Sequence, residues 1–443
     1  MIACEQEHLG ADKRRARTMV RDVGITTWVG RGAIAVVALL ACVAPSAAIE
    51  LGPDDWPAWR GQYGNGVAVG ALPPLVWSEQ SNVLWKTPVP GRGHGSPTVV
   101  GSRVFLPTTE ASQRVQAVLA FDRATGKPLW RRDVIENADL GQAHANNTHA
   151  TPTIASDGTH LFAVFHHGGS VEVLALDLAG QLVWRRSVGS YQSKFGYAAS
   201  PVVHGDCVIV VADSNDGSWL AALDRATGDE KWRMPRKNVG SFSSPVVAHV
   251  AGRTQLLISG GEQVVSYDPA SGQRLWSTQA ITSTTCGTIV WDGDLVFASG
   301  GHPGNETAGI RADGSGEVVW RNGVEFYEPS MLAHNGYLYG INKAGVAHCW
   351  RAADGEKMWR SRLATRGASA SPVMIGDRIY ISNEAATTFV FSADPAQFKL
   401  LATNQLGDDA FATLSICGGR IYLRVGHGSR SERQEILYCV GEG

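Results

Sequence analysis

The side chains best suited to chemistry gather in one long polar insert and in shorter polar segments along the chain. The insert spans residues 141–150 and contributes His144, Asn147 and His149. Imidazole and amide groups hydrogen-bond polar ligands, and histidine also exchanges protons near neutral pH. Further polar residues stand just before short apolar runs elsewhere: His94, Tyr197, Glu328, Arg366 and Asp409. These residues are our candidates for binding a ligand or a partner.

The spacings that define common catalytic and metal sites are absent from this sequence. It contains no Gly-x-Ser-x-Gly, His-Glu-x-x-His or P-loop pattern, and no Cys-x-x-Cys. His166 and His167 are metal-ligand types, but a hairpin turn accounts for the pair. In the segment 213–217 the glycine is one position early for an EF-hand calcium loop, and Asn-Asp-Gly is a common turn. We therefore predict no catalytic residue and no metal site.

A repeated segment indicates which elements position the candidates. The pattern Asp-x-x-Thr/Ser-Gly-x-x-x-Trp occurs at 122–130, 224–232 and 268–276, and weaker copies end at Trp184, Trp320 and Trp359. The Asp side chain can bond its own backbone two residues on, and Gly takes a positive φ without steric cost. Because apolar runs flank this turn, each copy predicts a β-hairpin whose second strand carries the tryptophan.

A second hairpin alternates with the first. It reads Ser-Pro-x-Val-x-x-Gly, and its eight copies begin near residues 96, 151, 200, 244, 288, 329, 371 and 413. Two hairpins per period give four short strands, and successive tryptophans are about 40 to 55 residues apart, which is the spacing of propeller blades. We predict an all-β fold: an eight-bladed β-propeller of four-stranded blades over residues 82–443.

The chain stops one strand short of a complete eighth blade. Residues 82–85, Asn-Val-Leu-Trp, have the form of the missing outer strand. We predict that this N-terminal strand closes the ring, which leaves no long unpaired sheet edge. The repeated tryptophans are predicted to dock neighbouring blades by burying a large apolar area. They are Trp85, Trp130, Trp184, Trp232, Trp276, Trp320 and Trp359.

In a propeller, the residues that precede each inner strand lie at the mouth of the central channel. The eight candidate residues are therefore expected to converge on one rim. Such a rim binds a ligand or a peptide, or it is a solvated polar surface without a ligand. The sequence leaves both interpretations open.

The repeats resemble the pyrroloquinoline quinone (PQQ) repeat, Ala-x-Asp-x-x-Thr-Gly-x-x-x-Trp. The resemblance covers residue 82 to the end, and the segment 55–61, Asp-Trp-Pro-Ala-Trp-Arg-Gly, resembles the lead-in of bacterial members. The resemblance implies an eight-bladed ring and two groups of proteins. Quinoprotein dehydrogenases bind PQQ and calcium in the ring, whereas BamB-like lipoproteins of outer-membrane β-barrel assembly keep the ring and lack the cofactor.

Within this family the sequence favours the non-catalytic group. The best-known alcohol-oxidising members carry two adjacent cysteines, which this chain lacks, and no segment matches their calcium ligands convincingly. We expect a monomeric ring that needs no cofactor and binds envelope proteins through a surface or a strand edge, as a BamB-like scaffold. The alternatives are a PQQ- and calcium-dependent oxidoreductase and a carbohydrate-binding propeller. Exposed aromatic side chains on one rim would indicate the latter, and Trp219, Trp291 and Trp350 are the ones to inspect.

The first residues have the features of an export signal. Several arginines precede the apolar run 32–40, which is too short to span a membrane, and Ser46-Ala47-Ala48 offers small residues for cleavage. We predict a signal peptide over 1–48, starting at Met1 or Met19, and a lead-in over 49–81. The protein would reside in the periplasm or at the outer-membrane periphery. Leu39-Leu40-Ala41-Cys42 resembles a lipobox, so Cys42 is a candidate lipidation site and the expected membrane contact.

Composition and cysteine usage narrow the class further. The formal net charge of −2 argues against nucleic-acid binding, which usually requires a basic face. Beyond residue 48 the cysteines are dispersed and odd in number, so at least one thiol stays free, and most occupy strand positions typical of small buried hydrophobes. These cysteines are Cys207, Cys286, Cys349, Cys417 and Cys439.

Overall fold

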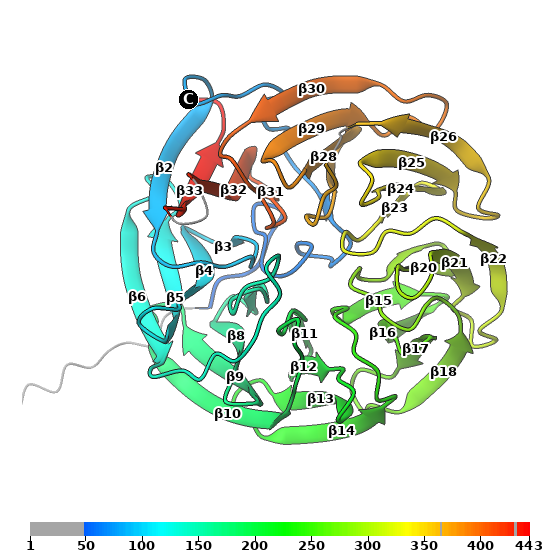
Figure 1. Cartoon of the computed structure of the whole chain (residues 1–443), viewed down its shortest axis with the longest axis horizontal. Coiled ribbons are helices and arrows are strands. Elements are labelled where there is room, and N and C mark those ends of the chain that lie inside the picture. Colours follow the sequence, from blue (N-terminus) through cyan, green and yellow to red (C-terminus); the bar gives the residue numbers. More distant parts are fainter. Residues whose placement is uncertain (1–47, 364–365, 429–431) are drawn as a thin grey trace, which may run out of the picture. The chain divides into compact units, whose positions relative to one another are not determined.

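Eight β-sheets stand around a central axis, as Figure 1 shows. The computed structural model describes residues 48–363, 366–428 and 432–443, and within them the chain forms strands and turns but no helix. The predicted all-β, eight-bladed propeller is therefore confirmed. Cys42 and the predicted signal peptide, apart from its last residue, lie outside the described residues. Within the described part, no helix is long and apolar enough to cross a membrane.

The strands of each blade run antiparallel and follow one another from the axis outward. The first four blades are formed by β3 (Thr98–Val100), β4 (Arg103–Glu110), β5 (Val115–Asp122) and β6 (Pro128–Ile135); β7 (Ala155–Ser156), β8 (His160–His167), β9 (Ser170–Asp177) and β10 (Leu182–Ser190); β11 (Val202–His204), β12 (Cys207–Ala212), β13 (Ser218–Asp224) and β14 (Glu230–Arg236); and β15 (Val246–Val250), β16 (Arg253–Gly260), β17 (Gln263–Tyr267) and β18 (Arg274–Gln279).

The other four blades complete the ring. They are formed by β19 (Val290–Asp292), β20 (Leu295–Gly300), β21 (Glu306–Arg311) and β22 (Val318–Asn322); β23 (Leu332–His334), β24 (Tyr337–Ile341), β25 (Val346–Arg351) and β26 (Lys357–Arg362); β27 (Val373–Ile375), β28 (Arg378–Ser382), β29 (Thr387–Ser392) and β30 (Leu400–Gln405); and β31 (Ser415–Cys417), β32 (Arg420–His427), β33 (Gln434–Val440) and β2 (Val83–Val89).

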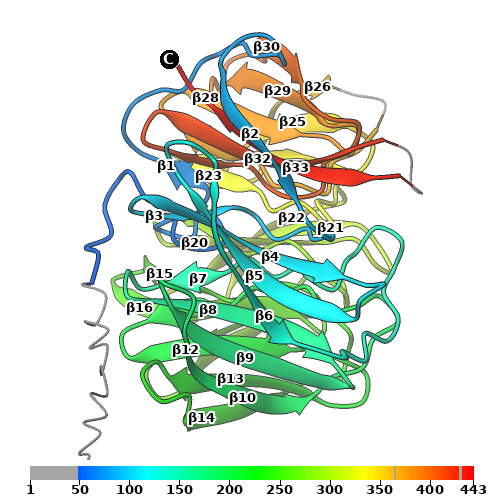
Figure 2. The ribbon, with the colours of Figure 1, turned by 90° about the vertical axis from the view of Figure 1, so that its left-hand side faces the viewer.

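The N-terminal strand closes the ring, as the sequence predicts. Strand β2 pairs antiparallel with β33 and places Trp85 opposite Cys439 (Figure 2). The eighth blade thus combines both ends of the propeller segment. A further strand, β1 (Val67–Ala68), pairs parallel with β27 and adds a fifth strand to the seventh blade. Two residues are too short a run to show strand periodicity, so no sequence pattern predicts β1.

The turn in each repeat is built as its residues suggest. The Asp122 carboxylate accepts the backbone N–H of Thr125 at 2.8 Å and its hydroxyl at 2.6 Å. Gly126 has a φ of 72°, and its N–H donates to the Asp122 carbonyl at 2.8 Å. The hydrogen bonds from Thr125 hold the pKa of Asp122 below its usual range. The turn therefore presents a glycine without a Cβ to the neighbouring blade.

The repeated tryptophans lie against these turns. Six of the seven indoles are at most 8% exposed, and Trp130 is half-buried. Trp232 donates its indole N–H to the Pro269 carbonyl of the next blade at 3.2 Å, and its ring covers Gly272. Trp85, Trp130, Trp184, Trp320 and Trp359 likewise donate to a backbone carbonyl in the following blade. Each contact joins one blade to its neighbour through apolar area and a hydrogen bond.

Two blade junctions depart from the pattern. Trp276 donates to the Gln255 side chain at 2.7 Å, and the Gln255 amide donates to the Ala312 carbonyl of the next blade at 2.8 Å. In the seventh blade Ala402 occupies the tryptophan position. There the lead-in supplies Trp77, which is 2% exposed and lies in the apolar cluster against which Ala402 packs. An indole from another part of the chain thus fills the seam that the repeat leaves open.

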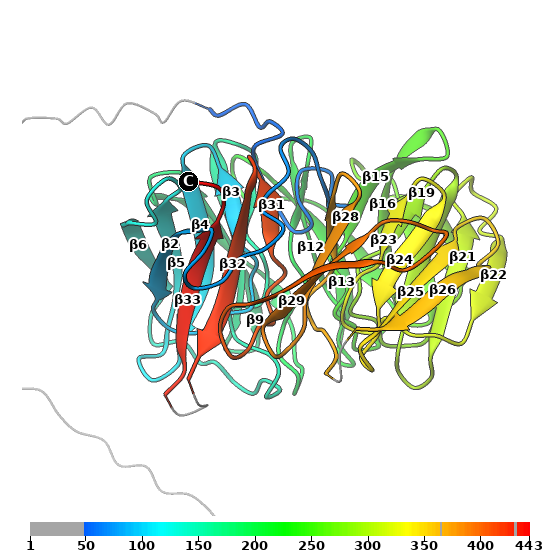
Figure 3. The same cartoon turned by 90° about the horizontal axis from the view of Figure 1, so that it is seen from above.

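The lead-in runs along one face of the ring (Figure 3). Trp56 exchanges backbone hydrogen bonds with Val99 of the first blade. Arg60 is fully buried and donates to the Met331 carbonyl of the sixth blade at 2.6 Å. Burial without a carboxylate partner lowers the pKa of Arg60 to about 9. The lead-in therefore ties together blades on opposite sides of the axis.

A matched pair of glycine substitutions tests the blade-docking contact. Gly272 and Gly252 have φ values of 73° and 72°, but a Cβ at Gly272 would lie 2.7 Å from the Trp232 ring, whereas one at Gly252 would meet nothing within 4 Å. We expect Gly252→Ala to cost about 1–2 kcal/mol of backbone strain. Gly272→Ala should cost about 1–3 kcal/mol more, because the indole must move. Denaturant unfolding measures both, and equal losses would contradict tight docking at this turn.

Candidate functional site

A pocket of about 330 Å³ opens on the channel axis. It is lined by segments that precede the inner strands, whereas the lead-in contacts the opposite ends of those strands. The pocket therefore opens on the face away from the lead-in. Trp59 of the lead-in also lines it, and its indole N–H donates to the Thr288 hydroxyl at 2.8 Å. Trp59 therefore contributes to the pocket from the side of the lead-in.

A belt of hydroxyl side chains surrounds the axis at the depth of the pocket. Serine or threonine stands two residues before the first strand of every blade: Ser96, Thr153, Ser200, Ser244, Thr288, Ser330, Ser371 and Thr413. In six of the eight junctions the backbone N–H donates to the hydroxyl of the next blade, at 2.8–3.0 Å. These bonds fix the spacing of the inner strands and therefore the shape of the pocket.

The belt corrects the alignment of one repeat copy. In the second blade, Thr153 and not Thr151 is equivalent to Ser96 and Ser200. The insert 141–150 displaces the Ser-Pro pattern by two residues there. The hydroxyl contacts were not predicted, although a serine or threonine in every copy was the signal that could have found them.

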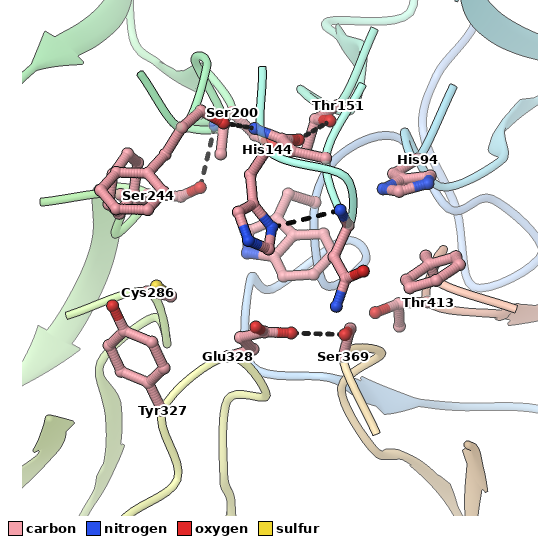
Figure 4. A pocket seen from close by; sticks show the side chains of 17 residues that line it. His94, His144, Thr151, Ser200, Ser244, Cys286, Tyr327, Glu328, Ser369 and Thr413 are labelled. Atoms are coloured by element: carbon pink, nitrogen blue, oxygen red, sulfur yellow. Dashed lines mark hydrogen bonds between the residues drawn. The ribbon is translucent and has the colours of Figure 1, made fainter. Parts of the chain in front are cut away.

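Four of the eight candidate residues meet in the pocket: His94, His144, Asn147 and Glu328 (Figure 4). The other four lie elsewhere. Tyr197 is buried between blades and donates its hydroxyl to the Val211 carbonyl at 2.7 Å. Asp409 is ion-paired with Arg433.

His149 and Arg366 also lie outside the pocket. The backbone carbonyl of His149 accepts the Gln116 amide at 3.0 Å, and burial lowers the pKa of its imidazole. Arg366 lines a separate, solvent-open hollow at the seventh blade together with Asn383. A position before an inner strand therefore places a residue near the rim, but the loop decides where its side chain points.

The pocket wall is largely aromatic, which the sequence analysis did not anticipate. Besides Trp59, it contains Phe195, Phe242, Tyr327 and Phe411. Phe195 and Phe242 meet edge-to-face with ring centroids 5.9 Å apart. Most of these aromatic residues precede inner strands, as the polar candidates do. Considering aromatic as well as polar residues at such positions would therefore have predicted them.

His94 is a neutral part of this wall. Its imidazole stacks on Phe411 with centroids 4.6 Å apart and planes 12° apart. Burial lowers the pKa of His94 well below its usual range, and the cations Arg92, Arg424 and Arg433 act in the same direction. At neutral pH the ring therefore carries no charge.

Glu328 is the carboxylate of the pocket. Among the described residues Ser369 supplies its one hydrogen bond, and the same Ser369 hydroxyl lies 2.8 Å from Glu384. Burial raises the pKa of Glu328, and the hydrogen bond from Ser369 opposes this effect. Because a hydroxyl has one proton, Ser369 can donate to only one of the two carboxylates at a time.

The described residues offer neither a metal cluster nor an activated thiol. They contain no group of three or more His, Cys, Asp or Glu side chains that could hold a metal ion. His167 pairs with Ser170 across a two-residue hairpin turn, and Asp213 is bound by Arg236 through two hydrogen bonds of 2.8 Å. Cys286 lines the pocket, but burial raises the pKa of its thiol far above the ordinary value.

The comparisons with known proteins agree with this architecture. The ring of PQQ-like repeats defines the class as an eight-bladed β-propeller. The sequence profile described as "Outer membrane protein assembly factor BamB" matches residues 67–215, 114–360 and 304–397, and the chain belongs to this family. The outer membrane protein assembly factor BamB of Burkholderia pseudomallei is 23% identical over 74% of this chain and 81% of its own length.

Dehydrogenases are also similar to the chain. Polyvinylalcohol dehydrogenases of Pseudomonas sp. and Sphingopyxis sp. are 25% and 24% identical over 41% and 69% of this chain, which spans only 29% and 44% of their lengths. Among solved structures, BamB from Moraxella catarrhalis superposes with a TM-score of 0.59, at 17% identity over 80% of this chain and 96% of its own. A europium-containing methanol dehydrogenase gives 0.67, at 10% identity over 88% and 98%. Such identities establish the shared fold alone.

The buried thiols give a direct chemical test of the site. All five described cysteines are free, and burial raises the pKa of Cys207 and Cys439 to about 11. Since the thiolate is the reacting form, iodoacetamide near neutral pH should label the native protein slowly at every described cysteine, Cys286 included. Mass spectrometry of native and guanidinium-unfolded protein measures this. Rapid native labelling of Cys286 would show instead that the pocket activates its thiol.

Proposed function

We propose that the protein is a non-catalytic propeller that binds other proteins of the bacterial envelope, with a scaffold role related to that of BamB. The observation that carries this proposal is the chemistry of the central pocket, which is aromatic and holds one carboxylate. The family match over residues 67–397 and the coverage of the Burkholderia BamB sequence support it. The predicted export signal is consistent with an envelope location.

The pocket residues do not fit PQQ with calcium. The quinone carries several carboxylates, which need cationic partners. Among the described residues that line the pocket there is no lysine or arginine to pair with them. Calcium takes carboxylate and amide oxygens, and the lining offers Asn146, Asn147 and a single carboxylate, Glu328. Trp59 could form a floor for a planar ring, and this single feature resembles a quinone site. The donor set as a whole favours a binding module over an oxidoreductase.

A carbohydrate-binding role finds little support in the off-repeat tryptophans. Trp219 and Trp350 are buried at 7% and 3% exposure, and Trp291 is half-buried. The guanidinium of Arg233 covers Trp219 at 4.7 Å from the ring centroid. Trp219 and Trp350 are therefore not available for sugar stacking.

Capture of envelope partners tests the scaffold proposal. The full-length protein, cross-linked in its own cells, should co-purify with components that fold outer-membrane β-barrels. Deleting the protein should lower the amount of heat-modifiable, folded barrel protein in the outer membrane, and the wild-type copy should restore it. Unchanged barrel levels together with no captured envelope protein would overturn the proposal.

Titration with PQQ and calcium tests the oxidoreductase alternative independently. A ligand at 100-fold excess over its Kd raises the free energy of unfolding by about 2.7 kcal/mol. We expect no calcium-dependent rise in Tm and no change in quinone absorbance. A saturable, calcium-dependent shift that Trp59→Ala abolishes would favour the oxidoreductase instead.

A further inference from the structure

The central pocket combines a buried negative charge with a wall of aromatic rings. Glu328 faces the cavity near His144 and Ser369 (Figure 4). Five aromatic residues and neutral His94 line the same cavity, together with uncharged amide and hydroxyl side chains. From this arrangement we propose that the pocket binds an alkylammonium group, from a small amine or from a lysine side chain of a partner. The inference rests on the proposed binding function and names the chemistry its pocket selects.

The charge balance on this side of the pocket is negative. Glu384 and Glu325 raise the pKa of Glu328, whereas His144 lowers it. Lys343 lies 3.6 Å from Glu325. A cationic ligand beside Glu328 would offset the charge of the carboxylates, and it would stabilise the ionised form of Glu328.

The cations on the opposite wall are already engaged. Arg424 and Arg433 both pair with Glu435, and Arg433 also pairs with Asp409. None of these residues lines the pocket. An anionic ligand would therefore meet Glu328 and find no unengaged guanidinium among these residues. The electrostatics exclude a carboxylate or phosphate more strongly than they exclude a neutral group.

The aromatic rings supply the second half of the recognition. An ammonium group within about 6 Å of a ring centroid is attracted by the π face, and the interaction is stronger in a desolvated site. Phe195 already shows this behaviour, because the Lys194 ammonium lies 5.1 Å from its centroid. The pocket-lining rings of Phe242, Tyr327 and Trp59 come from three other segments of the chain and surround the same space. A methylated or primary ammonium fits such a cage better than a strongly hydrated metal ion does.

The size of the cavity agrees with a small cation. Binding sites for small molecules usually begin at about 300 Å³, and this pocket holds about 330 Å³. Trp59 of the lead-in lines the pocket on one side, and we expect a ligand to enter from the face away from the lead-in. A lysine side chain presented by a partner would enter with its ammonium group first.

Calorimetric titration of the full chain tests the proposal with a matched pair of probes. Choline carries the cation, and 3,3-dimethylbutanol has nearly the same shape without charge. We expect choline to bind at least about tenfold more tightly, because only the cation is attracted by the Glu328 carboxylate and by the aromatic faces. Nα-acetyl-lysine methylamide and its Nε-acetylated form repeat the comparison for a peptide source. If choline binds more tightly than the lysine derivative, the ligand is a small amine; if the lysine derivative binds more tightly, it is a lysine side chain of a partner.

Variants locate the binding in the pocket. Glu328→Gln keeps the size of the side chain and removes the charge, and it should weaken choline about tenfold or more while leaving the neutral isostere unchanged. Phe242→Leu should weaken choline by roughly two- to thirtyfold through the lost π face. Glu262→Gln, at an exposed ion pair with Lys237, should change nothing. The Tm of each variant shows whether the fold is intact.

Two results would overturn the cation proposal. Equal affinity for choline and its neutral isostere would show that the pocket recognises the shape of the ligand and not its charge. Absence of binding by every cationic probe, with the variant proteins folded, would show that no ammonium group is recognised. Neither result would test the scaffold proposal, because the capture of envelope proteins tests that proposal separately. Conversely, choline binding together with unchanged barrel levels and no captured envelope protein would support the pocket chemistry and overturn the scaffold role.

Discussion

The closed ring depends on one contact repeated from blade to blade: an indole laid against the turn of the next sheet. The turn can accept the indole because its glycine has no Cβ. The turn keeps its shape because the aspartate carboxylate accepts hydrogen bonds from the backbone and side chains of the following residues. Where the sequence loses the motif, the contact is rebuilt by other means. The Gln255 side chain links Trp276 to the fifth blade through two hydrogen bonds. Trp77 of the lead-in packs in the apolar cluster beside Ala402. Such replacements indicate that every junction must be filled for a ring to stay closed.

The pocket is a consequence of that closure. Eight inner strands are held at fixed spacing by the hydroxyl belt, and the loops before them are brought to a common axis. The lead-in then contributes Trp59, whose indole is anchored on Thr288. The result is a pocket built from segments that are far apart in the sequence. A pocket whose walls are already in place loses less conformational entropy on binding than one that must be assembled.

The fold by itself does not separate a scaffold from an enzyme. BamB and quinoprotein dehydrogenases share the ring, and at identities below 25% structural similarity carries no statement about chemistry. The difference lies in the donors that face the channel. A polycarboxylate quinone needs cationic side chains, whereas the described lining of this pocket offers aromatic faces, uncharged amides and hydroxyls, and Glu328 as its one carboxylate. The same donors account for the preference for an organic cation.

The sequence by itself determined the local elements and the architecture. Period-two apolar runs, the Asp-to-Gly turn and the regular tryptophans are properties of neighbouring residues, so they report hairpins and blades directly. The count of hairpins and the missing last strand were enough to predict ring closure by β2. Four of the eight candidate positions also reached the pocket, because a position before an inner strand fixes where a loop lies.

Only the tertiary structure decided which side chains meet. Whether His149 or Tyr197 turns inward depends on how its loop packs against the neighbouring blade, and repeat patterns contain no information about that direction. The bond between Trp59 and Thr288 joins residues 229 positions apart, and Trp77 reaches Asn404 across 327. Such contacts arise only after the ring has closed, so no local pattern in the sequence can encode them.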